Sequence, residues 1–249
     1  DFATSGVGGW LTGALGLPRP TPLRRRAEAG TGLVGPLLLG PDANGRLAAI
    51  LGRQAGTEGQ TIHAEWSPDV RYGGLVFGAS NCIDATSAQG LYRFFHQSIR
   101  SVAEHGRIVV IGRPPELMIN VEGEAIQRGL EGFVRSLAKE ARRSIAVHIL
   151  YVAPGDEDAA QSTLAFLLSP RSAYVSGQPI RVTAPVAMSD IGAGHRGRRV
   201  LVTGASRGIG EAITRLFVAE CAQVVALDVA AAGDGLAALE GGLGVDTLT

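Results

Sequence analysis

The chain has 249 residues, of which 45% are hydrophobic and 18% charged, a composition that buries a substantial core and argues against global disorder. Lysine plus arginine and aspartate plus glutamate number 23 each, and this balance gives no basic surface for nucleic acid or for lipid. No apolar run reaches the roughly 18 residues of a membrane span, and the two cysteines lie far apart, so we expect a cytoplasmic protein without nucleic-acid, membrane or metal partners.

Residues 1–32 are rich in Gly, Pro, Thr and Arg and are interpreted as an N-terminal arm. From 33 to 186, short apolar β-type runs alternate with helix-type stretches. Strands separated by helices of this length predict crossover units, and therefore an α/β fold in which a parallel sheet lies between two layers of helices. The predicted strands are 33–40, 61–66, 74–79, 107–112, 145–152 and 178–183, and the predicted helices are 46–53, 88–104, 124–142 and 159–168.

Residues 187–197 are interpreted as a linker because 192–197 is rich in glycine. A second strand–helix–strand unit starts at 198, with strands at 200–203 and 223–228, a helix at 209–221, and the approach to a third strand at 241–249. The residues after 197 are too few for a doubly wound domain, which needs on the order of 100 or more. We therefore expect 198–249 to be the incomplete start of a domain, and the first residue, Asp1, to follow a missing beginning.

A glycine motif opens the helix of this second unit. Its sequence is Thr203-Gly204-Ala205-Ser206-Arg207-Gly208-Ile209-Gly210, after an apolar strand, where a phosphate-binding turn must lie. The first glycine permits a sharp turn, the second a close approach of the backbone to a diphosphate, and the third close packing of helix on sheet. An ordinary glycine-rich loop explains one glycine but not three. The motif predicts a Rossmann-type dinucleotide site made of Gly204, Ser206, Arg207, Gly208, Ile209 and Gly210, with the helix N-terminus facing the phosphates.

Asp228 ends the second strand of the same unit, where a carboxylate accepts bonds from the adenosine ribose and repels a 2′-phosphate. This favours NAD(H) as the cofactor. Arg207 keeps NADP(H) open, because a guanidinium in this loop can pair with a 2′-phosphate. The alternative is that Asp228 only caps a turn before the run of alanines that follows it.

The motif together with Asp228 resembles the opening of the short-chain dehydrogenase/reductase family. Residues 106–112, 129–140 and 172–180 resemble that family's fifth strand, its active-site helix and the approach to its last strand. Residues 33–186 thus resemble the back half of a reductase, and residues 198–249 resemble the front half of another. This order is similar to that of the high-molecular-weight 3-oxoacyl-[acyl-carrier-protein] reductases, which carry a degenerate flavodoxin-like domain before a ketoreductase domain. The resemblance implies NAD(P)H-dependent reduction of 3-oxoacyl thioesters of acyl-carrier protein or CoA in fatty-acid metabolism, by a homo-oligomer when complete.

The family's catalytic Ser–Tyr–Lys set is missing from the chain. By alignment on the neighbouring segments, the tyrosine position falls on Gly123, the lysine position on Gln127 and the serine position on Arg113. No catalytic residue is therefore predicted, and the chain by itself is expected to be inactive. The alternative function is a non-catalytic docking or oligomerisation module. The five histidines have no metal-ligand spacing, and each is interpreted as a surface or hydrogen-bonded residue.

Overall fold

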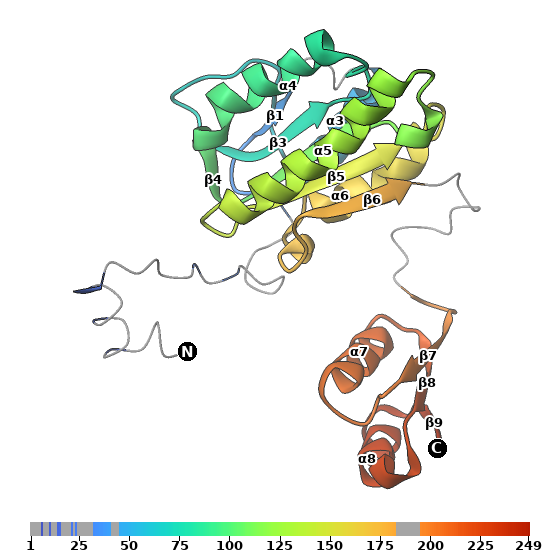
Figure 1. Cartoon of the computed structure of the whole chain (residues 1–249). Coiled ribbons are helices and arrows are strands. Elements are labelled where there is room, and N and C mark those ends of the chain that lie inside the picture. The colour runs from blue at the N-terminus through green and yellow to red at the C-terminus, as the bar shows by residue number, and fades with distance from the viewer. Residues whose placement is uncertain are drawn as a thin grey trace. The chain divides into compact units, whose positions relative to one another are not determined.

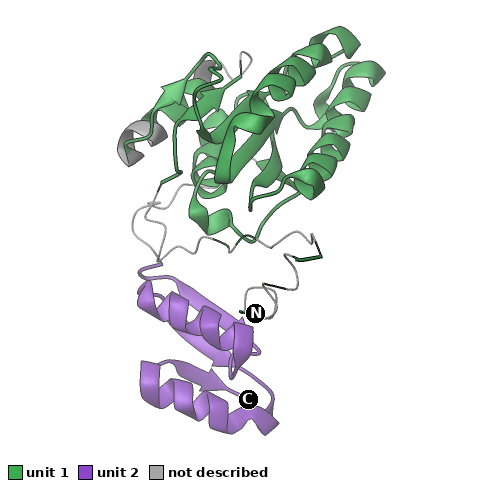
Figure 2. Ribbon diagram, turned by 90° about the vertical axis from the view of Figure 1, so that its left-hand side faces the viewer, with its two compact units in different colours: residues 1–185 green, residues 186–249 purple. Residues whose placement is uncertain are grey.

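The computed structural model describes residues 32–40, 45–182 and 195–249, together with the single residues 6, 10, 14, 15, 21 and 23. The chain divides into two compact units, Asp1–Pro185 (unit 1) and Val186–Thr249 (unit 2), which are coloured separately in Figure 2. Each unit has its own sheet. Most of the predicted N-terminal arm (1–32) and linker (187–197) lies outside the described residues.

Unit 1 is built on a six-stranded sheet in which all neighbouring strands run parallel. The chain adds β2 on one side of β1 and then β3 to β6 on the other side, in the order β2-β1-β3-β4-β5-β6. This is the flavodoxin-like order with a further strand. The strands are β1 (Leu37–Leu39), β2 (Ile62–His63), β3 (Tyr72–Gly78), β4 (Val102–Gly112), β5 (Ala146–Val152) and β6 (Gln178–Val182).

Helices cover both faces of this sheet (Figure 1). α4 (Ala85–Ser98) and α5 (Val121–Glu140) pack on one face, and α3 (Gly45–Glu58) and α6 (Gln161–Leu167) pack on the other. Side chains of a strand point alternately to the two faces, so alternate residues of the strands enter two separate cores. In β4 the first core takes Ile108 and Val110, and the second takes Val109 and Ile111. The predicted three-layer α/β fold is confirmed.

The predicted helix 88–104 was wrong at its C-terminal end. α4 starts earlier, at Ala85, because Asp84 and Ser87 form a capping box in which the Ser87 N–H donates to the Asp84 carboxylate at 2.7 Å. It ends at Ser98, and β4 already begins at Val102, which is fully buried and pairs with Tyr72. Burial of Val102 in the sheet therefore outweighs the helical spacing of the apolar residues, on which the longer predicted helix was based.

The other predicted elements of unit 1 are present with shifted ends. The strands predicted at 33–40 and 61–66 shorten to β1 and β2, and the helix predicted at 46–53 lengthens to α3. The helix predicted at 124–142 starts at Val121, because Asn120 accepts a bond from the Gly123 N–H at 2.8 Å. The helix predicted at 159–168 is divided into a 3-10 turn, Glu157–Ala160, and α6.

Unit 2 is a three-stranded parallel sheet in the order β7-β8-β9. Its elements are β7 (Arg199–Thr203), α7 (Gly208–Ala219), β8 (Gln223–Leu227), α8 (Gly233–Leu243) and β9 (Asp246–Leu248). Helix α8 was not predicted from the sequence, because four glycines in its eleven residues lower its helix propensity. Packing nevertheless forms the helix: Leu236 and Leu239 are buried in the core of unit 2, and Gly244, with a φ of 66°, ends it in the left-handed region.

Candidate cofactor site

The loop from β7 to α7 has the backbone shape that the glycine motif predicts. Gly204 has a φ of 66° and Gly208 a φ of 60°, conformations that residues with a Cβ rarely adopt. Gly204 turns the chain at the end of β7, and Gly208 is the first residue of α7. A Cβ built on Gly208 would meet no heavy atom within 4 Å, so the backbone there borders open space. The two positions combine a sharp turn with an accessible start of the helix.

Gly210 meets a different demand, because it packs on the backbone of the turn itself. A Cβ at this position would collide with the carbonyl oxygen of Gly204 and lie 2.6 Å from its carbonyl carbon. It would also lie 3.0 Å from the Cα of Ala205. The sequence analysis expected this glycine to bring the helix close to the sheet; its contacts are with the turn at the end of β7. Three glycines thus satisfy three separate backbone requirements.

The first turn of α7 is not closed by a side chain. The N-cap residue, Arg207, is extended, with a φ of −158°, and makes no side-chain hydrogen bond to the helix start. Arg207, Gly208 and Ile209 are exposed, Ile209 to 81%. The N–H groups of a first helical turn have no partner within the helix, and they carry the positive end of its dipole. An anionic group is what this position favours.

Asp228 lies against the glycine loop. Its Oδ2 accepts a hydrogen bond from the Ser206 N–H at 3.0 Å, and its Oδ1 accepts one from the Val229 N–H at 2.8 Å. The pKa of the Asp228 carboxyl lies below its ordinary value because of the neighbouring Ser206 hydroxyl and these two backbone N–H groups, with a smaller contribution from the charge of Arg207. The carboxylate is therefore ionised at neutral pH. Its bond to Ser206 joins β8 to the loop, which goes beyond the capping of a local turn.

The structure brings all the predicted cofactor-site residues to one place, the carboxyl ends of β7 and β8. In open α/β sheets ligands bind outside this edge. Backbone geometry there, rather than a set of converging side chains, defines the site. The residues concerned are Gly204, Ser206, Arg207, Gly208, Ile209, Gly210 and Asp228.

At the carboxyl ends of β3 and β4 of unit 1, the side chain of Gln127 from α5 binds the backbone of the loops among the described residues. Gln127 is fully buried. Its Nε2 donates to the carbonyl oxygens of Ala79 at 2.6 Å and Cys82 at 3.0 Å, and its Oε1 accepts from the Arg113 N–H at 2.9 Å. From the sequence, Gln127 was interpreted only as the place of the family's lysine. Its structural role was not visible, because its partners in the β3 loop are 45 and 48 residues away.

A buried histidine departs from the sequence analysis, which interpreted every histidine as exposed or hydrogen-bonded. His148 of β5 is fully buried, and neither ring nitrogen has a hydrogen-bond partner among the described residues. Burial, and then the charge of Arg107, lower the pKa of His148 to about 4. Arg107 is buried too, and donates to the Ser169 carbonyl oxygen at 3.2 Å and the Ser172 hydroxyl at 3.0 Å. The imidazole is therefore neutral at neutral pH.

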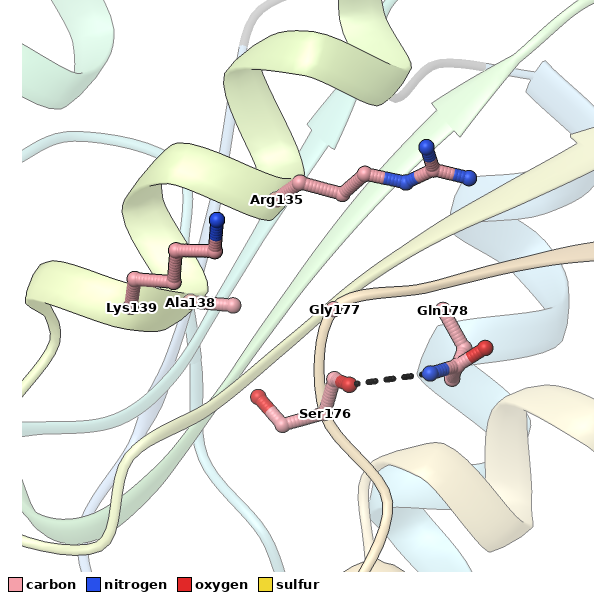
Figure 3. Close-up of a pocket in the computed structure, with 6 residues that line it drawn as sticks. All are labelled: Arg135, Ala138, Lys139, Ser176, Gly177 and Gln178. Carbon is pink, nitrogen blue, oxygen red and sulfur yellow. Dashed lines mark hydrogen bonds between the residues drawn. The ribbon is translucent and has the colours of Figure 1, made fainter.

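Unit 1 also has an open pocket of about 400 Å³, shown in Figure 3. It lies at the amino ends of β5 and β6, where the Ser176 hydroxyl accepts a bond from the Val147 N–H at 3.2 Å. This is the edge opposite to the one at which open α/β sheets bind ligands. The pocket is therefore distinct in place from the predicted dinucleotide site. The lining residues are Arg135, Ala138, Lys139, Ser176, Gly177 and Gln178.

Within the described ranges, no helix combines the length and the hydropathy that crossing a bilayer requires. Nor do three or more His, Cys, Asp or Glu side chains of those ranges gather as metal ligands would.

No protein-family model and no curated protein matches the chain. Solved structures of similar fold include a short chain dehydrogenase family protein from Francisella tularensis, at 12% identity and a TM-score of 0.44, over 60% of this chain and 97% of that one. BdcA from E. coli, in complex with NADPH, has 17% identity and a TM-score of 0.44, over 66% and 99%. The keto-reducing LugOII of lugdunomycin biosynthesis has 14% identity and a TM-score of 0.49, over 62% and 97%. Likenesses of this degree concern the fold, and an activity has to be argued from the site.

Proposed function

We propose that unit 2 binds a nicotinamide dinucleotide at the loop of residues 204–210 and Asp228, with NAD(H) preferred over NADP(H). The observation that carries the proposal is the three-glycine geometry: positive φ at Gly204 and Gly208, and backbone contact at Gly210. Glycine destabilises regular structure because it loses more freedom on folding than other residues do. Three glycines that each meet a different backbone demand, beside an uncapped helix start, fit a diphosphate resting on the helix N-terminus.

The preference for NAD(H) rests on the charge of Asp228. Because its lowered pKa keeps the carboxylate ionised, a 2′-phosphate on the adenosine ribose would meet like charge, whereas ribose hydroxyls would find an acceptor. Arg207 contributes to the lowering of this pKa, so its charge acts on Asp228 already in the free protein. A guanidinium at this place can also pair with a 2′-phosphate, which keeps NADP(H) as the alternative cofactor.

We further propose that the site serves the reduction of 3-oxoacyl thioesters of acyl-carrier protein or CoA. This substrate class rests on the order of sequence segments, which is similar to that of the high-molecular-weight reductases. The nicotinamide, when bound, supplies the electron pair, and this chain supplies binding and orientation. No proton donor is assigned within it, because Gly123, Gln127 and Arg113 occupy the positions of the family's tyrosine, lysine and serine.

The second candidate function is a non-catalytic module, and it concerns unit 1. The hydrogen bonds of Gln127 favour it, since a buried amide that binds three backbone groups supports the fold. The two proposals are compatible: unit 1 acts as a scaffold and unit 2 as the dinucleotide site.

The test is calorimetric titration of the full chain with NADH and with NADPH. We expect NADH to bind roughly tenfold or more tightly than NADPH, and Asp228→Ala to reduce that ratio, because the repulsion of the 2′-phosphate is removed. Asp234→Ala is the matched control, since it removes an exposed carboxylate from the start of α8 and should leave the ratio unchanged.

Three results would count against these assignments. Absence of binding by either dinucleotide overturns the site. An unchanged ratio in Asp228→Ala overturns the role of Asp228 alone. For the substrate class, the measurement is NADH consumption when 3-oxoacyl thioesters are added to a protein that contains the whole chain and the catalytic Ser–Tyr–Lys set; no consumption at any acyl length removes that part and leaves the dinucleotide site standing.

A further inference from the structure

Helix α8 touches the glycine loop at one of its own glycines, Gly235. A Cβ built on Gly235 would lie 2.8 Å from the carbonyl oxygen of Ser206 and 2.9 Å from the Cβ of Ser206. Both distances are shorter than those real Cβ atoms show, and the carbonyl oxygen cannot retreat unless the backbone of the loop moves with it. The absence of a side chain at 235 is therefore what lets α8 lie directly against the loop.

Ser206 is held on two sides by different elements. Its N–H donates to Asp228 at the end of β8, and its carbonyl and Cβ lie against Gly235 of α8. Only 9% of Ser206 is exposed, although the residues that follow it, from Arg207 to Ile209, are exposed. The two contacts fix the last buried residue before the open start of α7. Ser206 directly precedes the residues that carry the exposed N–H groups of the first helical turn.

The other glycines of α8 provide an internal comparison. Gly233, Gly241 and Gly242 lie in the same helix, and a Cβ built on any of them meets no heavy atom within 4 Å. None of the four helical glycines of α8 has a positive φ. Alanine at those three positions would thus fit the space and improve helix propensity. At Gly235 alone the helix needs glycine for contact with its surroundings.

We propose that Gly235 is a positioning residue of the dinucleotide site, which admits α8 against Ser206 and so fixes the phosphate-facing backbone of residues 207–208. It acts through Ser206 and is not assigned a contact with the dinucleotide. The inference rests on the proposed function of the glycine loop and extends it to an element that the sequence motif does not include. A side chain at position 235 displaces Ser206 and weakens dinucleotide binding.

The experiment compares Gly235→Ala with Gly241→Ala in the full chain. Affinity for NADH and for ADP-ribose is measured by calorimetry, and the hydrogen exchange of the Ser206 amide by NMR. We expect Gly235→Ala to weaken both ligands by roughly tenfold, the scale of a modest overpacking, and to accelerate exchange at Ser206. Gly241→Ala should leave affinity and exchange at their original values. Leu236→Ala separates positioning from stability: it removes a buried side chain from α8, so it lowers the unfolding temperature of unit 2 and leaves affinity below that temperature unchanged.

Each outcome decides the matter. If Gly235→Ala binds as tightly as the unaltered chain, Gly235 does not position the loop. If Gly235→Ala fails to fold, the single variant Ser206→Gly is compared with the double variant Ser206→Gly/Gly235→Ala. Removing the Ser206 Cβ relieves one of the two collisions. Equal affinities of these two variants overturn the inference. If the unaltered chain binds no dinucleotide, the proposed function fails, and Ser206 exchange still decides the positioning role: equal rates in Gly235→Ala and Gly241→Ala exclude it.

Discussion

The carboxyl-end edges of the two sheets are built in opposite ways. In unit 1 the side chain of Gln127 reaches from α5 to the loops after β3 and β4 and satisfies three backbone groups there. In unit 2 no side chain caps the start of α7, and the backbone at Gly208 borders open space. An α/β fold places loops at the carboxyl ends of its strands, where ligands can bind. The residues near these loops decide whether the loop backbone groups are already hydrogen-bonded by the chain's own side chains.

The loop from β7 to α7 in unit 2 depends most strongly on Gly210. The largest effect on dinucleotide affinity and stability is therefore expected there. In Gly210→Ala the new Cβ collides with the Gly204 carbonyl, and relief of this contact must distort the turn. We expect a loss of dinucleotide affinity of about 100-fold and a destabilisation of unit 2 by about 3 kcal/mol. Denaturant unfolding and ligand titration measure the two effects. Gly242→Ala, in open space on α8, is the control; similar behaviour of the two variants would break the comparison between the edges.

The closed edge of unit 1 is tested by Gln127→Leu. Leucine removes the Gln127 amide from the carbonyls of Ala79 and Cys82 and from the N–H of Arg113. The Ala79 carbonyl keeps its bond from the Cys82 N–H at 3.0 Å, and we expect unit 1 to lose about 3 kcal/mol of stability. Dinucleotide affinity should not change, because the site lies in unit 2. The matched control is Gln97→Leu on the exposed side of α4, with both variants compared by urea unfolding. Equal stabilities would show that Gln127 does not hold the edge.

A smaller effect is expected from His148, which should make the stability of unit 1 depend on pH. The folded-state pKa of His148, about 4, lies below its ordinary value of 6.5, so unfolding takes up a proton between these values. Stability is thus full above about pH 6.5 and falls by about 2 kcal/mol by about pH 5. His148→Leu, which removes two buried nitrogens without partners among the described residues, should flatten this dependence.

The control for this measurement is His96→Leu on the exposed side of α4, which should keep the acid-dependent loss seen in the original chain. The readout is the urea midpoint of unit 1 across that pH range. An unaltered pH slope in His148→Leu would show that the proton taken up on unfolding belongs to another group.

The parts of the molecule that were predictable from sequence are those that depend on neighbours in the chain. The glycine motif predicted its own turn because φ at Gly204 and the approach at Gly210 are local properties. The parallel three-layer fold followed from the alternation of apolar strands and helices. By contrast, α8 was missed because its glycines weaken the local signal, and it forms through burial of Leu236 and Leu239.

Contacts between distant segments could not be predicted, because they do not depend on neighbours in the chain. The bond from Ser206 to Asp228 spans 22 residues, and Asp228 was expected to face ribose rather than to hold the loop as well. His148 lies in an apolar strand whose pattern predicts burial, but the lack of a partner for its ring appears only when β5 is packed beside Arg107 of β4. Sequence patterns report periodicity and turns, and they do not report which polar atoms finally meet.

The packing around Gly112 limits which residues unit 1 can accept at positions 112 and 127. A Cβ on Gly112 would lie 2.8 Å from the Gln127 amide oxygen and 3.0 Å from the Tyr151 ring, whose hydroxyl donates to the Gln127 carbonyl oxygen at 2.8 Å. Replacing Gln127 with Lys would leave the Arg113 N–H without its present acceptor, and a larger residue at 112 would collide with both neighbours. Each of these single substitutions is therefore expected to lower the stability of unit 1.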